Sequence, residues 1–228
     1  MGDKPPKERA APRSVLEASA HYDDQYFAWQ RAIGEFAGWA DLPKFEPHVR
    51  ETDTVVDFGC GGGYLLSRLQ AAEKIGVEPN ASARQAALEH GFAVVSSPSE
   101  LPDGLADVII SNHALEHVRE PLRELERLRE KLKPNGLAVF VVPCEGVRQR
   151  WWPHDVNHHL YSWCPMSIGN LFTEAGFTVQ SSEPYIYRWT PISDRIARYG
   201  GRRIFDLSCR LYGHLKPSLS QAKVVARR

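Results

Sequence analysis

The sequence predicts an α/β fold, a doubly wound and mainly parallel sheet of seven strands with helices on both faces. From residue 53 onward, short β-branched or apolar runs alternate with amphipathic helical segments, as expected for repeated βαβ units. A glycine-rich turn directly follows the first run, and a Pro-Asn-Gly turn ends the third long helical segment. Ligands of such sheets bind beyond the carboxyl ends of the strands, so the residues that follow each strand form the candidate site.

Each element is expected from its local pattern. The predicted strands are 54–58, 74–77, 93–95, 107–111, 137–142, 177–182 and 222–226, and the predicted helices are 62–72, 81–90, 120–132 and 165–175. Residues 1–14 have no apolar periodicity, which predicts a disordered tail, and residues 15–228 are expected to form one domain. Within that domain we expect N-terminal lid helices (15–48), a substrate loop (144–164) and a basic C-terminal insertion (184–216). Helical packing of the N-terminal aromatic residues against the core is an equally open interpretation of that segment.

Composition excludes several classes of protein. The 228 residues carry a formal net charge of zero, which gives no global attraction to nucleic acid, although residues 184–228 hold ten Lys/Arg against two Asp. The four cysteines have no Cys-x-x-Cys spacing and no apolar leader precedes them, so free thiols in the cytoplasm are expected. No apolar run approaches the roughly 20 residues of a membrane-spanning helix.

The glycine-rich turn indicates which ligand binds. Its glycines are Gly59, Gly61 and Gly63, whereas the dinucleotide fingerprint would need glycine at position 64, which is Tyr64. Asp57 stands two residues before the first glycine, where it would repel a pyrophosphate but attract an amine. The turn therefore predicts a nucleoside ligand that is not held through phosphate.

An acid also ends the second predicted strand. Glu78 lies where a carboxylate can accept hydrogen bonds from both hydroxyls of a ribose. Alone it is weak support, but together with Asp57 and the glycine spacing it predicts a nucleoside site.

Four segments carry a resemblance to a known family. They are residues 54–63, 75–80, 107–118 and 124–142, and they include the run Ser111–Val118, which reads SNHALEHV, and the turn Leu132–Gly136. In order and content they resemble the motifs of class I S-adenosylmethionine-dependent methyltransferases with a Rossmann-like sheet, in the small-molecule subgroup of the type 11/23 kind. Asn135 stands where glycine is usual in the last turn, and asparagine also tolerates a left-handed conformation.

The resemblance implies S-adenosyl-L-methionine as the cofactor. Carried onto this sequence, it assigns the amino-acid part of the cofactor to Asp57 and the glycine turn, the ribose to Glu78, and the adenine to the surroundings of Ser96 and Ser97. The full set of predicted cofactor-binding residues is Asp57, Phe58, Gly59, Gly61, Gly63, Glu78, Pro79, Asn112 and His113, with Tyr22 and Trp29 contributed by the lid.

Catalytic residues are predicted from the chemistry of methyl transfer. A hydroxyl acceptor must lose a proton, and histidine is a suitable base near neutral pH, so His159, His158 and His113 are the catalytic candidates. His117 is expected to cap or pack its helix. The acceptor is expected to bind Trp151, Trp152, His154 and Tyr161 of the substrate loop. His154, Asp155, His158 and His159 could supply mixed nitrogen and oxygen ligands for a metal. The loop has too few acids for magnesium and no zinc spacing, so no metal site is predicted.

O-methylation of a small polar acceptor is the leading functional hypothesis, with a sugar, a nucleotide-sugar or a lipid-linked glycan as the acceptor. The alternative is a quinone or lipid precursor at the membrane surface, because residues 202–215 place four apolar side chains on one helical stripe beside arginines. A non-catalytic module that binds S-adenosylmethionine is the alternative from another class. Nucleic-acid methylation is disfavoured, because Ser111-Asn112-His113-Ala114 differs from the Asn/Asp-Pro-Pro-aromatic motif of base-modifying enzymes.

Overall fold

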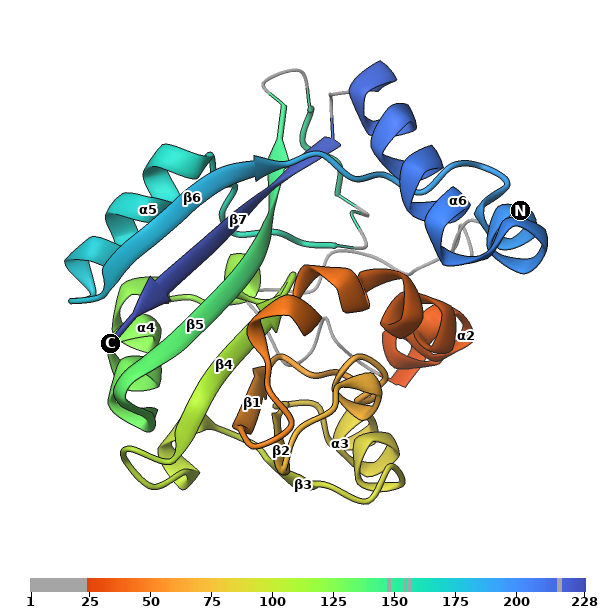
Figure 1. The fold of residues 1–228 in the computed structure, drawn as a ribbon. Coiled ribbons are helices and arrows are strands. Elements are labelled where there is room, and N and C mark those ends of the chain that lie inside the picture. The colour runs from red at the N-terminus through yellow and green to blue at the C-terminus, as the bar shows by residue number, and fades with distance from the viewer. Residues whose placement is uncertain (1–23, 147–148, 154, 156, 217–218) are drawn as a thin grey trace.

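A computed structural model describes residues 24–146, 149–153, 155, 157–216 and 219–228. Its seven strands form a single sheet in the order β3-β2-β1-β4-β5-β7-β6 (Figure 1). The strands are β1 (Thr54–Phe58), β2 (Glu73–Val77), β3 (Ala93–Val95), β4 (Ala106–Asn112), β5 (Leu132–Glu145), β6 (Thr178–Tyr185) and β7 (Leu219–Arg227). All neighbours pair in parallel except β7, which runs antiparallel to both β5 and β6. The predicted doubly wound, mainly parallel sheet is confirmed.

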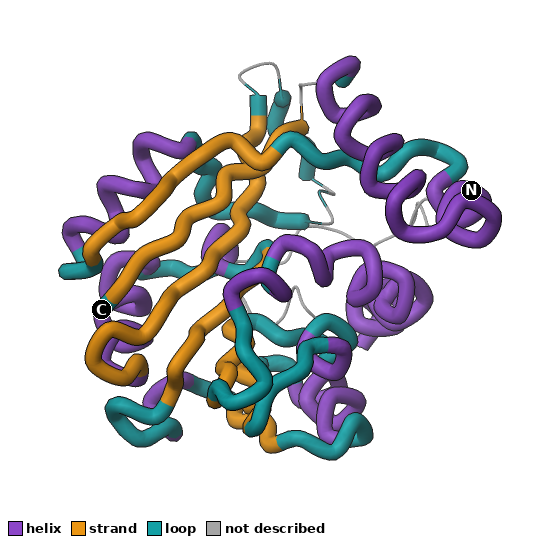
Figure 2. The backbone as a smooth tube through the Cα atoms, viewed as in Figure 1, coloured by secondary structure: helices purple, strands orange, loops and turns teal. Residues whose placement is uncertain are grey.

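Helices cover both faces of the sheet (Figure 2). The α-helices are α2 (Asp24–Asp41), α3 (Ala81–Leu88), α4 (Pro121–Lys131), α5 (Pro165–Glu174) and α6 (Ser193–Leu215), and the short 3-10 helices are η1 (Leu42–Lys44), η2 (Glu46–His48), η3 (Leu66–Arg68), η4 (Pro98–Glu100) and η5 (Leu115–His117). Among the described residues, no helix combines the length and the apolar character needed to cross a bilayer. The predicted disordered tail lies outside the described residues.

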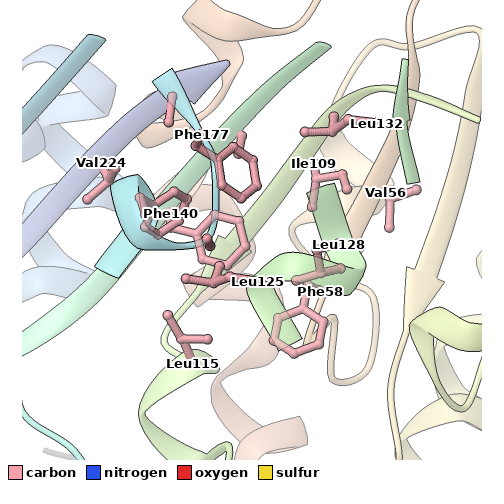
Figure 3. Packing of buried hydrophobic residues seen from close by; sticks show 14 of the residues in the cluster. Val56, Phe58, Ile109, Leu115, Leu125, Leu128, Leu132, Phe140, Phe177 and Val224 are labelled. Atoms are coloured by element: carbon pink, nitrogen blue, oxygen red, sulfur yellow. The ribbon is translucent and has the colours of Figure 1, made fainter. Parts of the chain in front are cut away.

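The alternation of side chains along the strands builds one apolar cluster on each face of the sheet. On one face, Val56 and Ile109 pack with Leu125 and Leu128 of α4 and with residues of α5, as Figure 3 shows for the labelled side chains. On the other face, strand residues such as Val55 pack against the segments around η1 and η3. Successive residues of a strand point to opposite faces, so this two-sided burial fixes the register of the central strands.

The predicted helix over residues 62–72 is wrong in extent, because the chain forms only the 3-10 helix η3 there. The Ser67 hydroxyl donates to the Tyr64 carbonyl at 3.0 Å, and Lys74 Nζ donates to the carbonyls of Ser67 at 3.2 Å and Leu69 at 3.0 Å. These carbonyls would otherwise accept the next helical hydrogen bonds, so the side chains end the helix early. A second difference lies at the Pro-Asn-Gly turn, which falls within β5, with Asn135 at φ 63°.

A third apolar cluster joins α2 to α6. Phe205 is fully buried and makes ring contacts with Phe36 and Trp39 of α2, and the Arg202 guanidinium lies 3.7 Å from the Trp39 ring centroid. The opposite side of α6 carries the predicted apolar stripe, and Ile204, Leu207, Leu211 and Leu215 are each more than half exposed. The stripe therefore does not pack against the edge of the sheet.

The four cysteines are all free, as predicted.

Candidate active site

The glycine turn (residues 59–63) is held against the end of β2. The amides of Gly59 and Cys60 both donate to the Val77 carbonyl, at 2.9 and 3.2 Å. Gly59, Gly61 and Gly63 have φ values of 78°, 53° and 77°, a left-handed region that favours glycine. A Cβ on Gly59 would also lie 2.3 Å from the Ala114 Cβ. The turn thus requires glycine for its backbone and, at Gly59, for its contact with the segment that follows β4.

Two acids flank the turn, the buried Asp57 and the partly buried Glu78. Asp57 is 2% exposed, and its burial, together with the Glu78 carboxylate, raises its pKa to about 7. Glu78 Oε2 accepts from the Gly61 amide at 3.0 Å, and Oε1 accepts from the Asn80 amide at 2.8 Å. Burial raises the pKa of Glu78, while these two backbone bonds oppose the change. Both carboxyl groups are thus poised beside the turn, and a cationic group between them would be stabilised.

Helix α2 packs directly on this region. Cβ atoms built on Gly34 and Gly38 would lie 2.2 Å from the Tyr64 ring and 2.4 Å from the Tyr64 carbonyl oxygen. The close approach of α2 to the turn therefore depends on glycine in the helix. Two residues were predicted to contact the cofactor from the lid. The backbone of Trp29 lies in α2, and the structure does not describe its side chain. Tyr22 lies outside the described residues.

The other predicted cofactor residues fall into different environments. Phe58 turns its ring into the core, 6.4 Å from the Phe140 ring, so only its backbone faces the turn. The Asn112 amide is engaged by two partners, because its Nδ2 donates to Asp41 at 3.1 Å and its Oδ1 accepts from Lys44 at 3.0 Å. The exposed Pro79 accepts a hydrogen bond from a guanidinium through its carbonyl.

The predicted adenine contact has an acid beside it. Ser96 donates to Glu100 Oε1 through its backbone amide at 3.0 Å and through its hydroxyl at 2.5 Å. Glu100 was not identified from the sequence, because it lies four residues further along, on η4.

A histidine cluster lies beyond the ends of β4 and β5. We define it as His113, Glu116, His117, Glu145 and His159. Glu116 is fully buried, and its Oε1 lies 3.5 Å from His113 Nδ1 and 3.9 Å from both His117 Nε2 and His159 Nε2. His159 Nδ1 lies 2.8 Å from Glu145 Oε1. The cluster therefore alternates carboxylates and imidazoles at short range.

The protonation states of the cluster follow from its burial and its charges. Burial raises the pKa of Glu116, but the neighbouring histidines, His113 first, outweigh this and leave its pKa below the usual value. Burial lowers the pKa of His117 to about 4, so this imidazole is neutral at neutral pH. An ionised carboxylate beside a neutral imidazole can accept a proton or bind a cation.

The remaining predicted catalytic and acceptor residues are more exposed. His158 has φ 47° and donates its backbone amide to Asp155 Oδ2 at 3.0 Å, which makes it a turn residue with an exposed side chain. Trp151 is 86% exposed and Trp152 is 63% exposed. Tyr161 stacks on Trp163 and donates its hydroxyl to a backbone carbonyl at 2.9 Å. His154 lies outside the described residues.

Of the three histidines predicted as catalytic, the structure brings His159 and His113 together around Glu116, and His158 contacts the cluster through its backbone. No role was predicted for Glu116 or Glu145. The sequence could have indicated Glu116, because it stands between Leu115 and His117 in the motif after β4.

The mainly parallel sheet, with a glycine turn at the end of β1 and an acid at the end of β2, is the fold of class I S-adenosylmethionine-dependent methyltransferases. Residues 21–182 match the family model described as a methyltransferase domain, and the chain belongs to that family.

Curated relatives match a smaller part of the chain than the family model does. A methyltransferase of uncharacterized function from Mycolicibacterium gilvum is 37% identical over 96 residues, 38% of each chain. A ubiquinone biosynthesis O-methyltransferase from a Chelativorans strain is 27% identical over 167 residues, 62% of this chain and 64% of the relative. The matches thus span less than two thirds of the length of these curated relatives.

Solved structures show the same fold over nearly the whole chain. One is a chain from the complex between the Haloferax volcanii Trm112 methyltransferase activator and a methyltransferase, with 19% identity, a TM-score of 0.67, and coverage of 92% of this chain and 97% of that one. Another is phosphoethanolamine N-methyltransferase 2 of Haemonchus contortus in complex with phosphomonomethylethanolamine and S-adenosylhomocysteine, with 16% identity, a TM-score of 0.65, and coverage of 94% and 60%. At these identities the similarity establishes the fold alone.

Proposed function

We propose that this methyltransferase uses S-adenosyl-L-methionine to methylate a hydroxyl group of a small acceptor. The observation that carries the proposal is the pair of acids beside the glycine turn, the buried Asp57 and the partly buried Glu78. Their chemistry fits the cofactor, because a buried carboxylate stabilises an ammonium, and each Glu78 oxygen keeps a lone pair for a ribose hydroxyl. When bound, the cofactor supplies an electrophilic methyl group on a sulfonium.

The histidine cluster supports oxygen as the accepting atom. A hydroxyl must lose its proton as the new bond forms, and His159, with Glu145 on its Nδ1, is the best placed of the predicted bases. Gly59 lies against Ala114, and Glu116 follows two residues later, so the cluster lies next to the glycine turn. His113 and the exposed His158 stay weaker candidates for the base.

Cofactor binding provides the first test. Labelled S-adenosylmethionine should bind the purified chain, and Glu78→Ala should weaken binding by about 10–100-fold, since it removes hydrogen bonds to a charged acceptor. Absence of binding, or equal binding by the variant, would favour another ligand, whereas cofactor binding without methyl transfer to any acceptor would favour the non-catalytic alternative.

The acceptor has two candidates with separate support. The exposed tryptophans 151 and 152 offer stacking surfaces for a sugar, nucleotide-sugar or lipid-linked glycan, the acceptor class predicted from the sequence. The ubiquinone biosynthesis relatives and the exposed stripe on α6 support a phenolic quinone precursor instead. Methyl transfer from labelled cofactor, measured in parallel on both acceptor sets, separates the two, and vesicle co-sedimentation tests the surface contact of residues 202–215.

A further inference from the structure

Three members of the histidine cluster have the arrangement of a ligand set. One ligand atom from each of Glu116, His117 and His159 lies within 4.8 Å of the other two. Below, these three residues are called the trio. They come from η5 and from the loop before α5, so the fold and not the spacing in sequence brings them together.

The Glu116 carboxylate is the anomaly that points to a ligand. It is fully buried, and in the described part of the chain neither of its oxygens has a hydrogen-bond partner. The nearest basic nitrogen, His113 Nδ1, lies 3.5 Å from Glu116 Oε1. A buried carboxyl group without hydrogen bonds is costly, and a bound cation would offset that cost.

The two imidazoles of the trio are oriented as metal ligands usually are. His159 turns Nε2 toward Glu116, while its Nδ1 contacts Glu145 Oε1 at 2.8 Å. His117 also turns Nε2 toward Glu116, and it hydrogen-bonds to the backbone of His158. A ligating histidine almost always donates its other ring nitrogen to a carboxylate or a carbonyl, which fixes the ring and the tautomer.

We propose that Glu116, His117 and His159 bind a divalent transition-metal ion of the zinc class. Two imidazoles and one carboxylate are the donor set that zinc uses in catalytic sites, where a fourth position stays open. Magnesium prefers oxygen donors only, so the histidines argue against it. No metal site was predicted from the sequence, where only the residues of the 154–159 loop were considered.

The catalytic role of this ion rests on the proposed function. An acceptor hydroxyl in the open position would have a lowered pKa and would release its proton to water. The oxygen lone pair would then form the O–CH3 bond while the S–CH3 bond breaks and its electron pair stays on sulfur. In this arrangement His159 is a ligand and Glu145 a positioning residue.

Metal binding is measured directly, without turnover. The protein is freed of metal with a chelator and titrated with ZnCl2 by calorimetry and with CoCl2 by visible absorption. One ion per chain is expected, with a cobalt spectrum of mixed nitrogen and oxygen ligation. Glu116→Gln and His159→Ala should each lower zinc affinity by at least about 100-fold, and Glu145→Gln by about 10–100-fold. His90→Ala, outside the cluster, is the matched control and should leave the affinity unchanged.

Circular dichroism and thermal unfolding confirm that each variant is folded before titration. The proposal is overturned if the folded wild type binds neither ion, or if Glu116→Gln and His159→Ala bind zinc as the wild type does. Cofactor affinity, measured on the same samples, separates this outcome from failure of the proposed function. Cofactor binding with full methyl transfer in the presence of chelator would contradict a catalytic metal and support the proposed function. Zinc binding without cofactor binding would support the metal site and contradict the proposed function.

Discussion

The glycine turn and its two acids come from two adjacent strands, whereas the histidine cluster is gathered from a 3-10 helix, a strand end and a loop. In the first region, backbone bonds from Gly59 and Cys60 to Val77 fix the geometry, and one further bond joins Gly61 to Glu78. In the second, side chains that are 29 residues apart, Glu116 and Glu145, meet around His159. The proposed cofactor site therefore depends on local backbone conformation, and the proposed site of acceptor activation depends on long-range packing.

The strongest way to break the first region is Gly59→Ala. The residue would have to hold φ 78° and place its Cβ 2.3 Å from Ala114. The backbone conformation alone costs about 1–3 kcal/mol, and the clash displaces the turn or the segment behind it. We expect loss of measurable cofactor binding and a lower Tm. Calorimetry measures the binding, and thermal unfolding measures the Tm.

Gly91→Ala is the matched control for that substitution. Gly91 has φ 85°, but a Cβ there would meet nothing within 4 Å. Stability should fall from backbone strain alone, with cofactor affinity unchanged. Equal loss of affinity in both variants would mean that the close approach to Ala114 is irrelevant.

The second region is tested by Glu145→Gln. The amide keeps the size of the side chain but removes the charge that lies 2.8 Å from His159 Nδ1. Turnover should drop by about 10–100-fold, whether His159 acts as base or as ligand, because its orientation is lost. Cofactor affinity should stay as in the wild type, and steady-state kinetics with equilibrium binding show both. The exposed Glu89→Gln serves as the control, and a parallel fall in cofactor affinity would contradict the separation of the two regions.

Asp57 gives the first region a pH dependence. With a pKa of about 7, its carboxyl is mostly protonated at about pH 6 and mostly ionised at about pH 8, so cofactor affinity should rise about tenfold across that range. In Asp57→Asn the affinity should be lower and flat. Calorimetry at several pH values measures the profile, and an unchanged slope in the variant would remove Asp57 as its source.

In the absence of cofactor, the stability of the folded chain depends on pH in the opposite direction: the contribution of Asp57 to stability falls as the pH rises. The pKa of Asp57 in the folded chain lies above the unfolded value of 3.8, so the protonated form is favoured by folding. Its contribution to stability is fully present below pH 3.8 and is lost as the pH rises through about 7. Urea unfolding of wild type and Asp57→Asn across this window isolates the contribution, because the other groups are common to both.

The sequence predicted the fold and the first region well because both are encoded locally. Alternating apolar runs predicted all seven strands, and the spacing of Asp57, Gly59, Gly61 and Gly63 predicted the turn. The extent of η3 depended on Lys74, a side chain from the next strand, which a helical pattern does not contain. The partners of Glu116 and His159 depend on how the loop after β5 lies over η5, and no periodicity encodes that contact.

The smallest expected effect concerns the outer edge of the second region, tested by Trp152→Ala. Trp152 is 63% exposed, so its removal should change the free energy of unfolding by no more than about 0.5 kcal/mol. Met166→Ala, another exposed apolar residue, is the control for stability. If the tryptophan stacks on the acceptor, its loss should raise KM for the acceptor by up to about tenfold, since an aromatic contact contributes about 0.5–1.5 kcal/mol. Both kcat and cofactor affinity should stay constant, because the cluster and the glycine turn are untouched. An unchanged KM would limit the acceptor site to the buried cluster and exclude the exposed part of the loop from recognition.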